Sequence, residues 1–253
     1  MIKCKNPGTI ALTYDDGPKR DYTDHILDLL ESYDAKATFF ITGNNANKGQ
    51  IDKTQEHINT IKRMNNGGHQ IGSHTWTHLN LAKISTEDRK NQIWNLEMAL
   101  NNIIGKIPTY MRPPYSSCGA ACQQDMSDLG YHIISYEFST EDYNQNNAND
   151  IQNSKDWFKG NITKDGATPE KKDWLTISHD TLEQTANNLT EYMLSTLTQL
   201  GYKAVTVGEC LGDPEDNWYR QVGDSSDRTG NSSTSVSATS TSAQVLPAHH
   251  FHK

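Results

Sequence analysis

The chain has 253 residues, enough to bury the core of one ordinary α/β domain. Its formal net charge of −8 at pH 7 argues against nucleic acid or an anionic membrane as the main partner, whereas a neutral or cationic polymer stays compatible. No apolar run approaches the length of a membrane span. The segment Met1–Cys4 lacks the apolar core of a signal peptide, so we expect a mature or truncated form if the protein is secreted.

The four cysteines form an even set, which permits complete pairing in any of three connectivities. We favour a local Cys118–Cys122 loop and a Cys4–Cys210 bond between the ends of the domain. The alternative is a set of free thiols in a cytosolic protein. N-glycosylation sequons add modest support for secretion, and they begin at Asn161, Asn188 and Asn231.

Short apolar segments alternate with longer segments of helical period, as expected for repeated βα units. Strands are predicted at residues 9–14, 36–41, 70–73, near 111–112, and at 132–136, 174–177 and 203–206. Helices are predicted around residues 26–33, 58–64, 86–104 and 182–200. This alternation predicts a parallel barrel or a doubly wound sheet. We favour a barrel, because polar residues gather at the ends of many strands.

The composition changes beyond about Val222 to Ser, Thr and Gly. Such a segment cannot bury enough apolar surface to fold. We therefore predict one folded domain over residues 1–222 and a disordered tail over residues 223–253. The histidines near the end of the chain, His249, His250 and His252, are interpreted as incidental rather than as a metal site.

Unusual polar residues follow the predicted strands, at the point where each strand ends. Asp15 and Asp16 follow the first strand, His74 the third, Arg112 the fourth and His179 the sixth, while Asp142 lies a few residues beyond the fifth. Because the carboxyl ends of parallel strands meet on one face, we expect these side chains to converge on one site.

The segment His74–His78 reads HTWTH and places two imidazoles four residues apart. That spacing predicts both imidazoles on one face of a helical turn, as a zinc-like ion requires. With one carboxylate from Asp15 or Asp16 they would make a three-ligand site that leaves a position open for water or substrate, as in catalytic zinc sites. HxxxH alone is a weak signal, and the alternative is an ordinary pair of surface histidines.

Of the adjacent carboxylates Asp15 and Asp16, one can bind the ion and the other remains for proton transfer, because side chains of neighbouring strand residues point to opposite sides. The second carboxylate would take a proton from water that a bound cation acidifies. Arg112 would pair with the carboxylate that does not bind the ion and hold it ionised, and His179 is a candidate general acid. Each of these motifs also has a structural alternative. The residues DDGP favour a tight turn, and the prolines after Arg112 favour a rigid one. A single histidine such as His179 more often has a structural role.

Five segments resemble, in order, the five motifs of the polysaccharide deacetylases of carbohydrate esterase family 4. They are Thr13–Pro18 (TYDDGP), His74–His78 (HTWTH), Arg112–Tyr115 (RPPY), Ser139–Tyr143 (STEDY) and Leu175–Asp180 (LTISHD). The resemblance covers about residues 4–220, and five ordered motifs are far more specific than any one of them. It is strongest to fungal chitin deacetylases, through Cys118, Cys122 and the ending AVTVGECLG at residues 204–212.

The resemblance implies a distorted (β/α)7-type barrel with parallel strands. It implies one divalent ion, Zn²⁺ or alternatively Co²⁺, on Asp16, His74 and His78. It makes Asp15 the general base, held by Arg112, and His179 the general acid, oriented by Asp142. The remaining implied roles are an oxyanion-stabilising backbone N–H at Tyr115, an aromatic wall at Tyr143 and a lining of the acetyl pocket at Ile177.

The implied reaction is removal of N-acetyl groups from chitin or chito-oligosaccharides by activated water, without a covalent acyl-enzyme. We expect a secreted or cell-wall monomer whose partner is chitin or another acetylated polysaccharide. One alternative is an acetylxylan esterase of the same family. Another is a wall protein that binds carbohydrate without catalysis, although a pure binder needs neither a base nor an acid. Glu137, Ser139 and Ile177 depart from the usual motifs without touching the ligands, the base or the acid.

Overall fold

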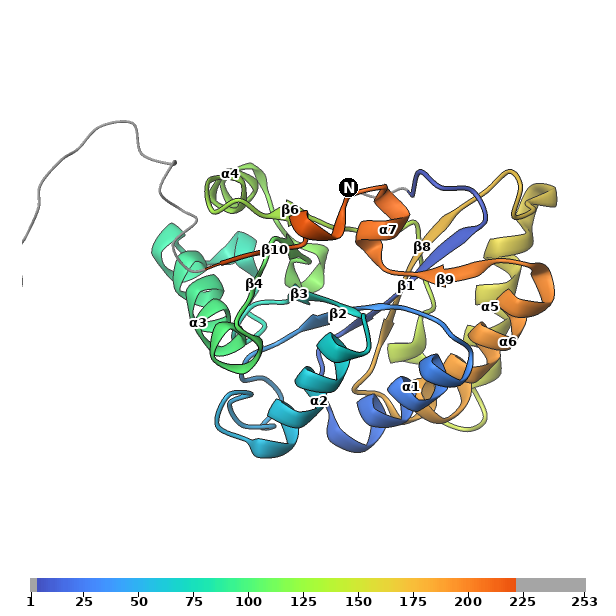
Figure 1. The fold of residues 1–253 in the computed structure, drawn as a ribbon, viewed down its shortest axis with the longest axis horizontal. Helices are drawn as coiled ribbons and strands as arrows, with labels where there is room; N and C mark the ends of the chain where they lie inside the picture. The colour runs from blue at the N-terminus through green and yellow to red at the C-terminus, as the bar shows by residue number, and fades with distance from the viewer. Residues whose placement is uncertain (1–3, 222–253) are drawn as a thin grey trace, which may run out of the picture. The chain divides into compact units, whose positions relative to one another are not determined.

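The fold is described from a computed structural model, which defines residues 4–221 (Figure 1). The predicted tail at residues 223–253 and its histidines lie outside the described residues. Within that part of the chain, none of the helices combines the length and apolarity needed to cross a bilayer.

The main elements alternate between strands and helices, as the sequence predicts. The strands are β1 (Thr9–Asp15), β2 (Thr38–Ile41), β3 (Gln70–Ser73), β4 (Ile107–Pro108), β5 (Tyr110–Met111), β6 (His132–Ile133), β7 (Phe138–Ser139), β8 (Trp174–His179), β9 (Lys203–Val205) and β10 (Tyr219–Arg220). The α-helices are α1 (Arg20–Ser32), α2 (Gln55–Asn66), α3 (Thr86–Ile104), α4 (Ala120–Asp128), α5 (Ile151–Thr163), α6 (Thr190–Leu200) and α7 (Val207–Leu211). Two shorter helical segments matter below, η3 (Asp142–Asn144) and the π-helical η5 (Thr185–Leu189).

The main sheet is parallel, with strand order β6-β5-β3-β2-β1-β8-β7, and β9 pairs with the first half of β1. Around the sheet, neighbouring strands follow one another in chain order, which is the order of a barrel and not of a doubly wound sheet. Among the described residues β6 and β7 end the sheet without pairing to each other. The predicted distorted barrel is confirmed, and it is open between these two strands.

Residues of β1 alternate between two separate cores. Ile10, Leu12 and Tyr14 pack in the layer between the sheet and the helices. Ala11 belongs instead to an inner cluster with Phe40, Leu175 and Val205. Because successive strand residues point to opposite faces, Thr13 and Asp15 face the barrel interior with Ala11. The interior is therefore apolar at its floor and polar where β1 ends.

The long helices cover the outer face of the sheet (Figure 1). Helix α1 illustrates how they attach, because Ile26, Leu27 and Leu30 recur on one side of it and are fully or almost fully buried. Each such side chain contributes about 1.5–3 kcal/mol when it leaves water. Helix packing thus holds the strands in place while their carboxyl ends stay free to build a site.

The floor of the barrel is closed near the ends of the described chain. Cys4 is bonded to Cys210 of α7, and Cys118 to Cys122 of α4, which are the pairs favoured from the sequence. The backbone N–H of Lys5 also donates to the Cys210 carbonyl at 2.8 Å. Strand β10 pairs antiparallel with β4 beside this region. Both ends of residues 4–221 are therefore fixed to the same domain.

Candidate active site

The polar residues that follow the strands converge on one pocket of about 490 Å³. Its lining includes eight predicted site residues, Asp15, Asp16, His74, His78, Tyr115, Tyr143, Ile177 and His179. Arg112 and Asp142 lie behind it and are 1% and 0% exposed. The topology explains the convergence, because β1, β3, β5 and β8 run parallel and end on the same face.

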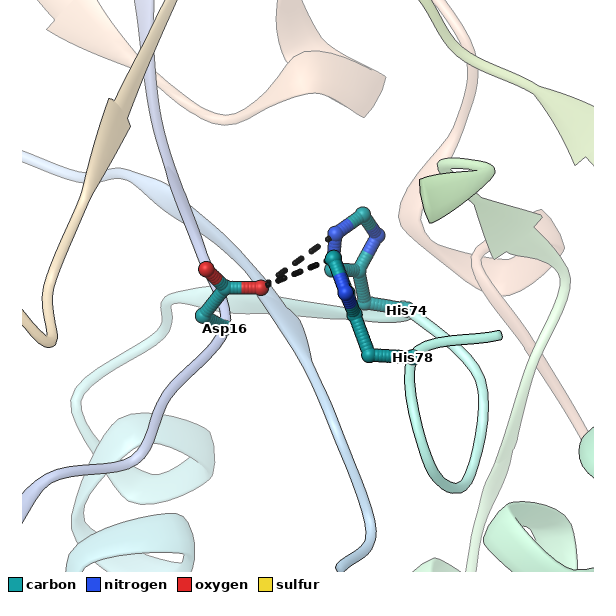
Figure 2. A group of neighbouring side chains, drawn as sticks. All are labelled: Asp16, His74 and His78. Atoms are coloured by element: carbon teal, nitrogen blue, oxygen red, sulfur yellow. Dashed lines mark ion pairs between the residues drawn. The ribbon is translucent and has the colours of Figure 1, made fainter. Parts of the chain in front are cut away.

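Asp16, His74 and His78 form a set that suits one small divalent ion (Figure 2). Asp16 Oδ1 lies 3.5 Å from His74 Nε2 and 3.2 Å from His78 Nε2. Neighbouring ligands of a tetrahedral zinc ion, each about 2.0–2.1 Å from the metal, stand about 3.3 Å apart, so these distances match such a site. Asp16 Oδ1 is also buried without a hydrogen-bond partner. A cation would satisfy this oxygen, which the protein itself leaves unpaired.

His74 is held in the form that can bind a metal. Its Nδ1–H donates to the Arg112 carbonyl at 2.7 Å, so Nε2 carries the free lone pair that faces Asp16. Burial lowers the pKa of His74 to about 3, against a smaller opposing effect of the Asp16 charge. The imidazole therefore remains neutral at any pH at which the protein is expected to work.

The segment between the two histidines is not the helical turn predicted from their spacing. Thr75 and His78 have φ values of 72° and 60°, which are left-handed and incompatible with a helix. The loop is instead fixed from outside, where the Thr77 N–H donates to Gln92 Oε1 at 2.7 Å and Gln92 Nε2 donates to Thr77 Oγ1 at 2.8 Å. The histidines meet because α3 supports this loop, and HxxxH periodicity was the wrong reason for expecting it.

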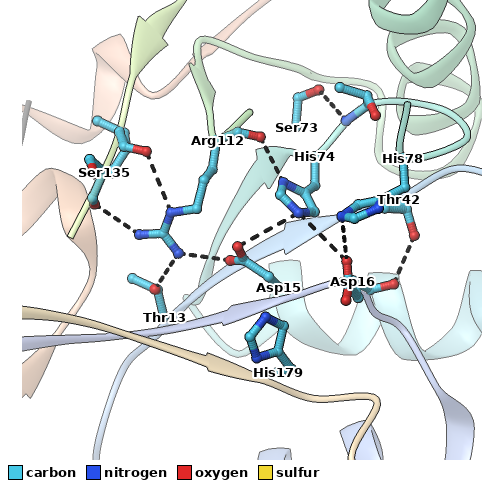
Figure 3. A network of polar contacts seen from close by, with 12 residues as sticks. Thr13, Asp15, Asp16, Thr42, Ser73, His74, His78, Arg112, Ser135 and His179 are labelled. Atoms are coloured by element: carbon cyan, nitrogen blue, oxygen red, sulfur yellow. Dashed lines mark hydrogen bonds and ion pairs between the residues drawn. The ribbon is translucent and has the colours of Figure 1, made fainter. Parts of the chain in front are cut away.

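Asp15 lies outside the ligand set and pairs with Arg112 (Figure 3). Arg112 Nη1 donates to Asp15 Oδ1 at 2.7 Å and to Thr13 Oγ1 at 2.6 Å. The same guanidinium donates to the Ser135 carbonyl and lies over the Phe40 ring, 4.4 Å from its centroid. Burial raises the pKa of Asp15, while Arg112 and His179 oppose that rise. A buried carboxylate with a raised pKa is well matched to accepting a proton near neutral pH.

A backbone turn places both aspartates in the same pocket. Asp15 is the last residue of β1, and Asp16 has left the strand with φ of 78°. Strand alternation alone would have sent the two side chains apart. The turn is braced by Lys48, whose Nζ donates to the carbonyls of Asp16 and Gly17 at 3.0 and 2.6 Å and to Thr42 Oγ1 at 2.7 Å. The sequence did not predict this role of Lys48, because a lysine in a loop rich in Asn and Gly is expected to be exposed to solvent.

His179 faces Asp15 from the end of β8 (Figure 3). Asp142 is fully buried and accepts from both the backbone N–H and the Nδ1–H of His179, at 2.7 and 2.8 Å. Thr185 of η5 donates to the same carboxylate at 2.7 Å. Burial alone would lower the pKa of His179, but the hydrogen bond and charge of Asp142, with smaller effects of Asp15 and Asp16, raise it to about 9.

Aromatic and aliphatic residues surround the polar centre. Tyr115 and Tyr143 are exposed, and their rings lie against His78 and His179, with centroids 4.7 and 5.7 Å apart. Ile177 lines the pocket floor. Tyr136 and Leu182 line it as well and were not identified from the sequence. Tyr136 lies at the end of a predicted strand, so the argument from strand ends could have identified it as a site residue. The sequence around Leu182 contains no feature that predicts a place in the site.

Comparison with known proteins identifies the family. The family model of polysaccharide deacetylases matches residues 2–134. A chitin deacetylase of Colletotrichum lindemuthianum is 43% identical over 221 residues, which cover 87% of this chain and 86% of the relative. A chitin deacetylase of Pestalotiopsis sp is 40% identical over 88% of this chain and 70% of the relative. The solved structure of the Colletotrichum lindemuthianum chitin deacetylase superimposes with a TM-score of 0.81, covering 87% of this chain and 94% of that one at 43% identity. The chain belongs to the polysaccharide deacetylase family.

Proposed function

We propose that this protein removes N-acetyl groups from chitin or chito-oligosaccharides, releasing acetate and leaving a free amine on the sugar. One observation carries the proposal: a set of three ligands for a divalent ion stands beside a buried carboxylate, Asp15, that is not a member of the set. Similarity to two chitin deacetylases supports the choice of substrate. All of these residues come from one chain, so a monomer suffices.

The residues divide the hydrolysis into two proton transfers. A divalent ion held by Asp16, His74 and His78, Zn²⁺ or Co²⁺, would polarise the acetyl carbonyl and bring the pKa of water toward neutrality. Asp15 accepts a proton as the water oxygen bonds to the carbonyl carbon. His179 then donates its proton to the sugar nitrogen while the carbon–nitrogen bond breaks, so that acetic acid and a neutral amine leave, and the acid ionises to acetate in water.

The other residues position the substrate and the two proton carriers. Arg112 fixes the Asp15 carboxylate, and Asp142 keeps His179 both oriented and protonated. The Tyr115 backbone N–H would donate to the developing oxyanion. Tyr143 offers an aromatic wall to a sugar ring, and Ile177 an apolar surface to the acetyl methyl group.

We further propose that the protein acts outside the cell or in the cell wall. The two disulfides support this location, because such bonds persist in oxidising compartments and are rare in the cytosol.

Metal removal tests the proposed function. The protein is stripped with a chelator, and Zn²⁺ or Co²⁺ is added back while bound metal and acetate release from chitin pentamer are both measured. We expect one ion per chain to bind and restore acetate release, and His74→Ala to lose both. Acetylated xylan is assayed under the same conditions. Full activity without metal would contradict the mechanism, and acetate from xylan but not from chitin would assign the esterase reaction instead.

A further inference from the structure

A second hollow lies beside the catalytic pocket, on the other side of η3. It encloses about 860 Å³ between the segment around Glu141 and helix α5. The motifs of the catalytic centre do not extend to α5, and no residue of this helix lines the catalytic pocket. The hollow is therefore a space distinct from the catalytic pocket, with a different lining.

The wall formed by α5 carries a large indole ring, that of Trp157. Trp157 is 55% exposed, whereas the buried side of the helix is made by Ile151, Ser154, Phe158 and Ile162. Gly160 follows one turn later, and a Cβ added there would meet no atom within 4 Å. More than half of the Trp157 side chain therefore remains accessible in the hollow that it lines.

The polar groups of the hollow are amides, carboxylates and the Ser154 hydroxyl. Gln145, Asn153 and Asn161 line it together with Glu141 and Asp156, and no lysine or arginine of the described chain does so. Amides both donate and accept hydrogen bonds, which suits hydroxyl and acetamido groups. The absence of a lining cation disfavours phosphate or another anion. An aromatic platform with amides around it fits a neutral sugar, whose C–H face packs on the ring while its edge is polar.

The hollow and the catalytic pocket share one wall. Glu141 lines the hollow, and its Oε2 accepts from the Tyr143 hydroxyl at 2.8 Å and from Asn144 Nδ2 at 3.1 Å. Tyr143 lines the catalytic pocket and is itself 54% exposed. The hydrogen bond between Tyr143 and Glu141 therefore links the linings of the two spaces. A linear polymer leaving the pocket past Tyr143 would therefore reach the hollow at Glu141.

We propose that the hollow between η3 and α5 binds N-acetylhexosamine units of the polysaccharide that lie several units from the one being deacetylated, with Trp157 as the stacking platform. This inference rests on the proposed function of the pocket. Binding in this hollow would make the enzyme prefer long polysaccharide chains to short ones. Short oligomers that end before Trp157 gain nothing from the hollow, whereas longer ones bind more tightly and react with the same turnover once bound.

Replacing Trp157 tests this inference. The protein is produced in a bacterial host, because Asn161 begins a sequon and a glycan there would lie in the hollow. For Trp157→Ala we expect KM for chitin hexamer to rise about fivefold or more with kcat unchanged, as for loss of an aromatic anchor. KM for the dimer should not change. The matched control is Trp94→Ala on α3, whose indole is 45% exposed and lines neither space.

Binding is measured separately from turnover. Calorimetric titration of chitin hexamer into Asp15→Asn protein, with and without Trp157→Ala, reports the hollow even if no acetate is released. The inference would be overturned if Trp157→Ala left the affinity for hexamer unchanged, or if it lowered the affinities for dimer and hexamer by the same factor. If the unmodified protein releases no acetate from any chitin oligomer, the proposed function fails instead, and the two failures are told apart.

Discussion

In the proposed mechanism, two neighbouring aspartates have different roles because of one backbone angle, the φ of 78° at Asp16. Asp16 turns out of β1 with φ of 78° and presents an unpaired oxygen to the two histidines. Asp15 remains in the strand, points into the barrel and is tied to Arg112. The chemical distinction between a ligand and a base is therefore made by conformation, since the two side chains are identical.

Replacing Asp15 by Asn isolates its role as a base. The amide oxygen can still accept from Arg112, so the fold and the ligand set should remain, but the amide cannot take a proton. We expect turnover of chitin pentamer to fall about 10²–10⁴-fold with bound metal unchanged. Metal analysis and acetate release on the same samples check this, with Asp16→Asn as the contrast that should lose metal. Substantial turnover in Asp15→Asn would remove Asp15 from the mechanism.

The charge of Asp142 should control the alkaline limit of activity. His179 has an ordinary pKa of 6.5 that is raised to about 9, so it stays protonated as pH rises until about 9. The stability that this pairing contributes is likewise complete below 6.5 and is lost as pH rises through about 9. In Asp142→Asn the pKa of His179 should fall, and the alkaline limb of kcat/KM should move down by roughly one to two pH units.

Glu141→Gln is the control for that experiment, because it removes one negative charge from the adjacent residue, which has no hydrogen bond to His179. Its alkaline limb should stay in place. An unshifted profile in Asp142→Asn would show that another group sets the alkaline limit.

At the scale of elements, the loop that carries His74 and His78 depends on its neighbour α3. Gln92 makes two hydrogen bonds to Thr77, and the chain cannot hold this left-handed loop by helical periodicity. In Gln92→Met we expect the dissociation constant for Zn²⁺ to rise about tenfold or more, as for other residues that orient metal ligands. Competition with a chromophoric chelator measures it. Gln152→Met on the exposed face of α5 is the matched control, and equal affinity in both variants would contradict the role of Gln92.

The sequence predicts elements well where burial and chain order act together. Helix α3 has the predicted bounds, and the residues at the ends of β1, β3, β5 and β8 meet as expected, because parallel strands leave little choice. Helix α4 was missed because only Cys122 and Met126 are buried on it. Helix α5 does bury Ile151, Phe158 and Ile162 at helical spacing, and was missed among surrounding Asn and Asp residues.

What the sequence could not supply is geometry that is created only when distant segments meet. The left-handed residues Asp16 and His78 are ordinary amino acids for which no local pattern predicts a positive φ. Lys48 becomes a brace only when its loop closes over Thr42 and the turn at Gly17. The choice of site residues was accessible from strand ends, but the way in which they are held was not.

For the whole molecule, the Cys4–Cys210 bond should matter much more than Cys118–Cys122. The chain-entropy model gives about 5 kcal/mol for a bond that closes so long a loop and about 2 kcal/mol for one between cysteines only 4 residues apart. Replacing Cys4 and Cys210 by Ser should lower Tm by roughly 10 °C, and the other pair by roughly half of that or less. Thermal unfolding followed by circular dichroism checks this. Equal shifts would contradict the entropic account.

The position of the closed floor of the barrel also determines how the domain is oriented when it is attached to a support. Cys4 precedes the amino end of β1, and β10 pairs with β4 just before β5 begins, so the described chain enters and leaves at the pole opposite the strand ends that build the pocket. A linker or resin joined directly at Cys4 or directly after β10 would lie on the side of the domain away from the pocket. A domain immobilised in this way would therefore keep its catalytic pocket facing away from the support and accessible to an insoluble substrate.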